Sequence, residues 1–499
     1  MGSKRRALLV LLATVNCVII MPMLFHQTRR VGDGGGTLSP TARPSARSQD
    51  HGHHLAHATP RSGPPGFLPD VPVLILAHNR SAYLKRSLES VLAAAGVTPA
   101  NILVSIDGQH PDTEQVARSL GIRIAALPQS QGQPAGRVCF HYKRSLALAF
   151  ERQPAARYVI VLEEDLQVAR DFFSYFQQTI PLLELDPTLL LISAWNDQGY
   201  VHASNDVDSS QVFRVERMSG LGWVCSRTLF EELEPKWPAT AKNWDWDQWL
   251  RLESVSQGRD TVIPSISRTH HFGGHGVHMT PAFQHLYFDG RRLNTEHPVM
   301  RVNGASSAEG YDRELARFIS GAMMFPTSPC SASLHPGQDY VLFIKQGPSS
   351  DAGEPDYSNW LKLARCFKIW DLDVRGQYKR YEGRACQHPR NTGYCHNLET
   401  PDKLGFQDVF IRCWPNGPWR PLLPGYASTH THAHVTDFPF IAALSGYSTW
   451  RLWWQQSRVV VVGSNSPFAR PLTDSSAIRC ATQPNLLVPK FLCESWRND

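Results

Sequence analysis

This sequence of 499 residues lacks several common signatures of nucleotide and zinc binding. No Walker motif occurs. No glycine-rich loop follows the first expected strand, residues 71–77, where His78, Asn79 and Arg80 stand instead. The ten cysteines form no CxxC zinc pattern. Binding of ATP, binding of NAD through a dinucleotide fingerprint and zinc-finger structure are therefore not predicted.

A strong excess of charge of one sign is also missing. The 50 Lys and Arg residues exceed the 44 Asp and Glu residues by only six, and the basic residues form no long stripe outside the N-terminus. We therefore interpret the surface as mildly basic and expect no nucleic-acid partner.

The N-terminus carries a targeting pattern. Lys4, Arg5 and Arg6 precede an apolar run at residues 7–25, interrupted only by Thr14 and Asn16. As a helix this run just spans a hydrocarbon core of roughly 30 Å, and its basic flank predicts a cytoplasmic N-terminus. A cleaved signal peptide is the alternative, but no small-x-small site follows promptly. We expect a cytoplasmic tail (1–6), an uncleaved type II anchor (7–25), a flexible stem rich in Gly, Pro, Ser and His (26–68) and a lumenal remainder.

Apolar runs and amphipathic segments alternate after residue 70. Strands are expected at 71–77, 102–106, 123–127 and 158–162, with helices at 83–95, at 112–120 and after His141. This order predicts an α/β fold with a mainly parallel sheet. Ligands of such sheets collect at the carboxyl ends of the strands, where Arg80, Asp107 and residues 163–165 stand.

The acidic group Glu163–Asp165 directly follows an apolar strand. Because adjacent side chains alternate faces, at most two of the three carboxylates can point at one ligand. Carboxylates at a strand end suit a hard divalent cation that also binds substrate phosphates. A nucleotide sugar bound through a metal therefore fits better than NAD or ATP, and a solvated acidic turn is the alternative.

Two further segments combine residue types in unusual ways. Residues 243–249, Asn-Trp-Asp-Trp-Asp-Gln-Trp, place aromatic faces that can pack on a sugar ring beside carboxylates that can accept a hydroxyl proton. A helix with Trp in the core and Asp exposed is the alternative. Residues 270–278 contain four His and three Gly, and we expect a loop over the phosphates rather than a zinc site.

With these segments in place, residues 72–287 resemble the catalytic domain of the β-1,2-N-acetylglucosaminyltransferases of glycosyltransferase family 13. The resemblance is carried, in family order, by the motifs at 162–166 (LEEDL), 172–173 (FF), 192–197 (ISAWND), 220–223 (GLGW), 234–238 (EPKWP) and 266–268 (ISR). It implies a GT-A (nucleotide-diphospho-sugar transferase) fold, a UDP-GlcNAc donor, Mn²⁺, a Golgi membrane location, and inverting transfer to the 2-hydroxyl of an α-mannose on a glycoprotein acceptor.

The resemblance also implies roles for particular residues. Arg80 and Asp107 match the family's nucleotide contacts, His141 matches the family's substrate-binding His, and Glu164 matches a donor-sugar contact. Asp165 matches the single direct metal ligand, and Asp247, not Asp245, matches the general base. With Trp246 beside the base, these residues form the predicted site.

The sequence also departs from the family pattern. His278 stands where the family has a phosphate-contacting Ser. Leu191 and Thr261 replace both partners of a family disulfide.

The acceptor stays open at this stage. The motifs at 193–200, 244–247 and 369–376 are most similar to the O-mannose branch of the family, whereas the short stem matches the layout of the N-glycan branch. A catalytically inactive glycan-binding relative is the alternative function. The retention of both Asp165 and Asp247 favours activity.

The C-terminal half holds a segment unlike the family. We expect the catalytic domain at 69–325, a C-terminal subdomain at 326–470 and a tail at 471–499. Within the subdomain, residues 380–446 have no periodic pattern, and we interpret them as a translated intron or gene-model error, with a lineage-specific loop as the alternative. Cysteines at positions 330 and 366 recur in the O-mannose branch, which implies a disulfide between Cys330 and Cys366.

Overall fold

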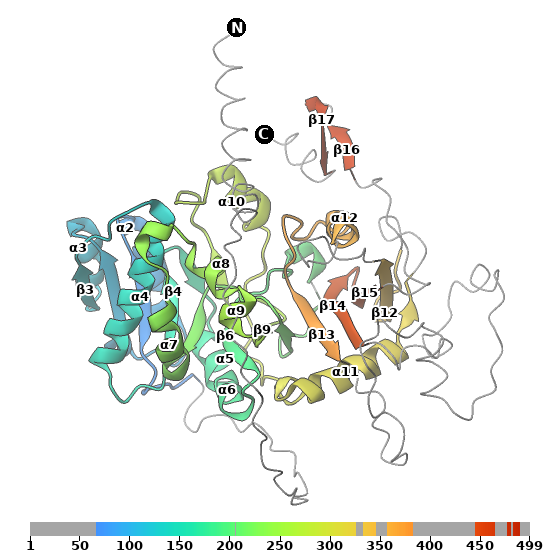
Figure 1. The fold of residues 1–499 in the computed structure, drawn as a ribbon, viewed down its shortest axis with the longest axis horizontal. Helices are drawn as coiled ribbons and strands as arrows, with labels where there is room; N and C mark the ends of the chain where they lie inside the picture. Colours follow the sequence, from blue (N-terminus) through green and yellow to red (C-terminus); the bar gives the residue numbers. More distant parts are fainter. Residues whose placement is uncertain are drawn as a thin grey trace, which may run out of the picture. The chain divides into compact units, whose positions relative to one another are not determined.

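The computed structural model describes residues 66–204, 206–325, 333–345, 357–382, 445–464, 477–480 and 483–489. Most of them belong to two sheets and the helices that cover them (Figure 1).

The larger sheet has eight strands in the order β3-β2-β1-β4-β8-β6-β9-β7. Pairing is parallel from β3 to β4 and between β6 and β9, and antiparallel at the other steps. In chain order the strands are β1 (Val73–Ala77), β2 (Ile102–Asp107), β3 (Arg123–Leu127), β4 (Tyr158–Glu163), β6 (Leu189–Ser193), β7 (Val212–Val215), β8 (Trp223–Ser226) and β9 (Asp260–Pro264). This is the mixed, mainly parallel α/β sheet that the sequence predicts.

Helices cover both faces of this sheet (Figure 1). Strand β1 shows why its sequence is continuously apolar: Val73, Ile75 and Ala77 pack in one core cluster, and Leu74 and Leu76 pack in another. The first cluster includes side chains of α2 (Ser81–Ala93) and α5 (Phe172–Thr179), and the second includes those of α4 (Pro134–Arg152), α7 (Arg227–Leu233) and α8 (Trp246–Leu250). The result is a three-layer α/β/α arrangement.

A second sheet of five strands, in the order β11-β12-β15-β14-β13, follows in the C-terminal half. Its strands are β11 (Met323–Met324), β12 (Asp339–Lys345), β13 (Gln377–Glu382), β14 (Ser445–Trp454) and β15 (Ser457–Ser464). Side chains of α11 (Ala308–Gly321) pack in one cluster with this sheet, and those of α12 (Ser358–Cys366) pack in another. Both α11 and β11 lie before residue 326, the expected start of the C-terminal subdomain.

Shorter elements complete the described chain. Strands β5 (Leu166–Val168) and β10 (Thr269–His271) pair with each other, as do β16 (Ala477–Cys480) and β17 (Gln483–Pro489). The remaining helices are α3 (Pro111–Ser119), α6 (Leu182–Leu185), α9 (Glu253–Ser256) and α10 (Pro281–Tyr287). The 3₁₀ turns are η1 (Pro99–Asn101), η2 (Val201–Ala203), η3 (Glu234–Lys236), η4 (Thr240–Lys242) and η5 (Asn303–Ala305).

Two expected boundaries need correction. Residues 66–68 were assigned to the flexible stem, but the Gly66 amide donates to Gln177 Oε1 at 2.7 Å, and Leu68 is buried in a core cluster. The expected insertion at 380–446 overlaps strands at both ends, because β13 runs to Glu382 and β14 begins at Ser445. The rest of it, 383–444, lies outside the described residues.

The expected anchor at 7–25 also lies outside the described residues. Within the ranges that the structure does describe, no helix is long and apolar enough to cross a membrane. The anchor therefore stays a prediction.

Candidate active site

The ends of β1 and β4 bring the first predicted site residues together. Arg80 caps the N-terminus of α2 just after β1, and its Nε donates to Glu164 Oε1 at 2.7 Å. Glu164 also accepts the His78 backbone N–H at 3.1 Å, and its own amide donates to the Leu76 carbonyl at 3.0 Å. Burial raises the pKa of Glu164, and the Arg80 charge opposes that rise. Burial opposes the charge on Arg80, but Asp165 and Glu164 raise its pKa above the ordinary value.

Asp165 is the second buried carboxylate of this group. Its Oδ2 lies 2.9 Å from Arg80 Nη1 and 3.5 Å from His271 Nε2. Its Oδ1 is buried and has no hydrogen-bond partner among the described residues. Burial alone would raise the pKa of Asp165, but His271 and Arg80 hold it at about 2, so the group is a carboxylate at neutral pH.

The loop after β10, residues 272–280, lies against Asp165, and its expected position over the phosphates stays a prediction. The Phe272 amide donates to the Asp165 carbonyl at 3.1 Å, and Arg80 Nη1 donates to the His275 carbonyl at 2.8 Å. A Cβ atom at Gly273 would lie 2.5 Å from Asp165 Oδ2, so only glycine allows this approach. The predicted phosphate contact, His278, instead lies 2.7 Å from Asp245 Oδ1, and that hydrogen bond raises the pKa of His278.

Two other predicted substrate-binding residues, Asp107 and His141, lie on or beside β2. Asp107, at the end of β2, is 5% exposed and accepts the backbone N–H and the hydroxyl of Ser130 at 2.8 and 2.9 Å. His141 on α4 is buried, and its Nε2 lies 3.1 Å from the Ser105 hydroxyl. Burial lowers the pKa of His141 to about 4, so it is a neutral imidazole at neutral pH. The buried His141 therefore supports the end of β2 through its contact with Ser105.

The predicted base, Asp247, lies on α8. Its side chain is 29% exposed, and its Oδ2 lies 2.9 Å from Nη2 of Arg251, one helical turn later. Tyr142 connects helix α8 to the acidic group at the end of β4. Its ring stacks on that of Trp246, and its hydroxyl donates to Glu163.

The expectation that a ring face of Trp246 stacks on a sugar is wrong, because other aromatic side chains already cover these faces. The indole is 6% exposed, stacks on Tyr142 and Trp223 with centroids 4.1 and 5.4 Å apart, and lies against the backbone of Gly220. Trp249 is buried in the same cluster. The alternative, with Trp in the core and Asp exposed, describes α8 better because a five-residue helix needs large buried side chains to hold it.

Sequence reasoning missed two partners of the predicted residues. His271 belongs to the His-rich run, but nothing in the sequence pairs it with Asp165, which is over one hundred positions earlier. Arg251 had a usable signal, because residues four apart on a helix face the same side. The pair Asp247–Arg251 therefore follows the ordinary helical spacing.

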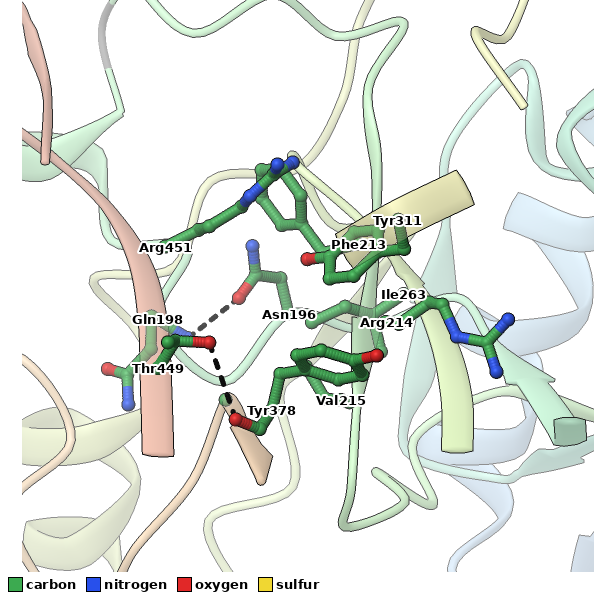
Figure 2. A pocket seen from close by; sticks show the side chains of 11 residues that line it. Asn196, Gln198, Phe213, Arg214, Val215, Ile263, Tyr311, Tyr378, Thr449 and Arg451 are labelled. Carbon is green, nitrogen blue, oxygen red and sulfur yellow. Dashed lines mark hydrogen bonds between the residues drawn. The ribbon is translucent and has the colours of Figure 1, made fainter. Parts of the chain in front are cut away.

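A small cavity lies elsewhere, between the β7–β9 edge of the main sheet and the second sheet (Figure 2). Its lining includes Phe213, Arg214, Tyr311, Tyr378 and Arg451, and none of the predicted site residues. In Figure 2 the Thr449 hydroxyl donates to the Tyr378 carbonyl beside this cavity.

The donor set around Asp165 fits one hard divalent cation. In the part of the chain that the structure describes, no group of three or more His, Cys, Asp or Glu side chains is placed to hold a metal ion. The unpartnered, ionised Asp165 Oδ1 is an oxygen ligand of the kind such cations prefer. A cation bound there would take its other ligands from substrate phosphates and water.

Comparison with known proteins supports the expected family. The GNT-I family model matches residues 56–298. The α-1,3-mannosyl-glycoprotein 2-β-N-acetylglucosaminyltransferase of Arabidopsis thaliana is 32% identical over 248 residues, which cover 46% of this chain and 52% of that relative. The chain thus matches about half the length of this curated relative.

Solved structures give weaker similarities. The mannosyltransferase PcManGT of Pyrobaculum calidifontis, in complex with GDP-Man and Mn²⁺, has a TM-score of 0.29 at 13% identity and covers 42% of this chain and 60% of that chain. GalNAc-T7 with UDP, GalNAc and Mn²⁺ has a TM-score of 0.29 at 11% identity and covers 40% and 43%. TM-scores this low carry no argument about function.

Proposed function

Because residues 56–298 belong to the GNT-I family, we propose that this protein transfers N-acetylglucosamine from UDP-GlcNAc to the 2-hydroxyl of an α-linked mannose on a glycoprotein. The observation that carries the proposal is the group formed by Arg80, Glu164 and Asp165 at the ends of β1 and β4. It combines a guanidinium for phosphate oxygens with a carboxylate for a cation at the edge of the sheet where α/β proteins bind ligands.

The donor side follows from this group and from Asp107. The Arg80 guanidinium can donate to a diphosphate oxygen, and Asp107 stands at the end of the neighbouring strand to accept hydroxyls of the nucleoside. Glu164 is fixed by two hydrogen bonds, so its orientation toward the donor sugar is set before the substrate binds.

Asp165 is the proposed protein ligand of Mn²⁺. When bound, the cation supplies positive charge against the diphosphate as the bond to the sugar breaks. Asp165 is already a carboxylate at neutral pH, so no proton has to leave before it can bind a cation. The close approach of Gly273 to Asp165 keeps the loop at residues 272–280 against this carboxylate. The loop thereby limits the access of bulk water to Asp165.

Asp247 is the proposed general base. Inverting transfer is a single displacement: the mannose O2 forms a bond to the sugar C1, the bond from C1 to the diphosphate oxygen breaks, and the O2 proton passes to Asp247. A base on α8, separate from Asp165, keeps its ability to accept a proton beside a nearby cation. Its exposure of 29% leaves it open to an acceptor.

The location and the acceptor are part of the same proposal. We propose a single-pass type II protein of the Golgi membrane with a lumenal catalytic domain, on the strength of the basic and apolar pattern at residues 4–25. The acceptor is a mannose-terminated glycan, either O-mannosyl or the N-glycan core.

A transfer assay tests the proposal directly. The full-length protein in detergent is incubated with UDP-GlcNAc, Mn²⁺ and either an O-mannosyl peptide or a trimannosyl N-glycan. Formation of a β-1,2-linked product with one acceptor supports the proposal and identifies the branch. Binding of glycan with no transfer to either acceptor would instead indicate an inactive glycan-binding protein.

A further inference from the structure

Arg251 is buried more deeply than the arginine of an ordinary surface ion pair. Its side chain is only 7% exposed, although Asp247, its partner, is 29% exposed. Arg251 Nη2 lies 2.9 Å from Asp247 Oδ2, and Nε donates to the Met218 carbonyl at 3.0 Å. The guanidinium is therefore held at two points behind a carboxylate that faces the solvent.

Other charges surround this arginine from two parts of the fold. Those of Asp373, Asp197 and Arg375 act on it in addition to that of Asp247. Asp197 follows β6 of the main sheet, and Asp373 and Arg375 precede β13 of the second sheet. Arg375 Nε lies 2.9 Å from Asp373 Oδ1, and Arg375 Nη1 lies 3.5 Å from Asp197 Oδ1.

Hydrogen bonds fix the members of this group. The Trp195 indole N–H and the Ser219 hydroxyl donate to the two oxygens of Asp197 at 3.1 and 3.0 Å. Asp373 accepts the indole N–H of Trp370. Asp197, Asp373 and Arg375 thus form a fixed group beside Arg251, in which the two carboxylates favour the charge of Arg251 and Arg375 opposes it.

A purely structural explanation predicts little effect of Arg251 on catalysis. Pairs four residues apart on an exposed helix contribute only about 0.3–0.5 kcal/mol. Arg251 differs because its guanidinium is buried, and burial opposes its charge and lowers its pKa despite the neighbouring carboxylates. Burying the charged guanidinium of Arg251 costs free energy of folding. The group that this guanidinium orients is the more exposed carboxylate of Asp247.

We propose that Arg251 is a positioning residue that fixes the carboxylate of Asp247 toward the acceptor hydroxyl, and that the hydrogen bond to the Met218 carbonyl holds Arg251 in place. This inference rests on the proposed function. With Oδ2 bound to Arg251, Oδ1 has no partner among the described residues and is left to accept the proton.

The test compares Arg251→Met and Arg251→Lys with a matched control, Arg259→Met. Arg259 has the same contact pattern, with Nε donating to the Ser256 carbonyl at 2.9 Å and Nη2 lying 2.8 Å from Glu232 Oε1, but Glu232 is not a site residue. Each full-length variant is assayed for kcat and for KM of UDP-GlcNAc and acceptor, and its thermal melting is recorded.

We expect Arg251→Met to lower kcat by about 10–100-fold, since a base misplaced by roughly 1 Å loses about that much rate. The KM for UDP-GlcNAc should stay within about threefold, because the donor group is made by other residues. Arg251→Lys should fall between the wild type and Arg251→Met, and Arg259→Met should keep the wild-type kcat.

A double-mutant cycle gives the decisive readout. In an Asp247→Asn background, which has no base to position, adding Arg251→Met or Arg251→Lys should lower kcat by less than about threefold. An equal loss in both backgrounds, or a kcat like that of Arg259→Met, overturns the proposal. If Arg251→Met does not fold, the Arg251→Lys cycle decides. Absence of transfer by the wild type overturns the proposed function instead, which keeps the two failures distinct.

Discussion

A single methyl group added at Gly273 tests whether the loop at residues 272–280 and Asp165 form one site. The Cβ of Gly273→Ala would lie 2.5 Å from Asp165 Oδ2, 2.7 Å from its Cβ and 2.9 Å from its Cγ. Ordinary contacts begin at 3.4 Å, so the loop and the carboxylate must separate by about 0.9 Å. Asp165 cannot yield easily because Arg80 and His271 hold its Oδ2.

The expected size of the effect follows from this displacement. Overpacking at a buried position costs about 1–3 kcal/mol of stability, which a protein of this size can tolerate. Misplacing a binding or reacting group by roughly 1 Å costs about 100-fold in rate. We therefore expect kcat/KM to fall by about 100-fold and half-saturation by Mn²⁺ to move to a higher concentration, while the protein stays folded.

The neighbouring residue provides the control. A Cβ at Gly274 would have its nearest neighbour, the Pro281 Cα, at 3.6 Å, which is an ordinary contact. Gly274→Ala makes the same chemical change one residue later and should keep kcat/KM within about twofold. Both variants are compared in initial-rate assays across a Mn²⁺ titration, with thermal melting as the check on folding. Equal kcat/KM and equal Mn²⁺ half-saturation for the two variants would refute the reasoning.

Four further predictions follow from the site and from the C-terminal half. Asp165→Ala should lower turnover by at least about 10³-fold, because it removes the proposed metal ligand; full activity of this variant in EDTA would contradict the assignment. Asp247→Asn should retain donor binding and lose transfer by about 10²–10⁴-fold; a large rise in the dissociation constant of UDP-GlcNAc with turnover intact would show a binding residue instead. Cys330 and Cys366 should form a disulfide worth roughly 3–4 kcal/mol, detectable by mass spectrometry of non-reduced peptides. Cys366 is disulfide-bonded and Cys330 lies outside the described residues, so this pairing stays a prediction. Replacing residues 383–444 by a short turn should leave activity unchanged or improved, because Glu382 and Ser445 are already paired across β13 and β14; a variant that no longer folds would show that the segment is structural.

Local structure and burial could be predicted from the sequence because they depend on neighbouring residues. The continuous apolar run of β1 indicates a strand covered on both faces, and the structure shows Leu74 and Ile75 fully buried in different clusters. Strand β3 has the expected bounds, and α2 and α3 lie within two residues of theirs. The sequence also predicted that Arg80, Asp107 and the acidic group lie at one edge of the sheet, because parallel strands end on the same side.

Some site features were beyond the reach of periodicity. The interleaved Trp and Asp residues of α8 fit both a sugar-binding surface and a buried face. Only the packing of Trp246 on Tyr142 and Trp223 decided between them. The corrected boundary at residues 66–68 has the same cause, since these residues lie in a stretch rich in Gly and Pro and the burial of Leu68 depends on a core cluster formed by distant parts of the chain.

Long-range partners were decided only by tertiary structure. Asp165 meets His271, and the base on α8 connects through Arg251 to charges on Asp197 and on the segment before β13. Apart from the local Asp247–Arg251 pair, these approaches join residues far apart in the chain, and they depend on the sheet order β4-β8-β6-β9 and on the pairing of the strands that precede or follow them. A side chain's chemistry is written in the sequence, but which charge faces it in a buried, weakly screened environment is set by how the layers pack.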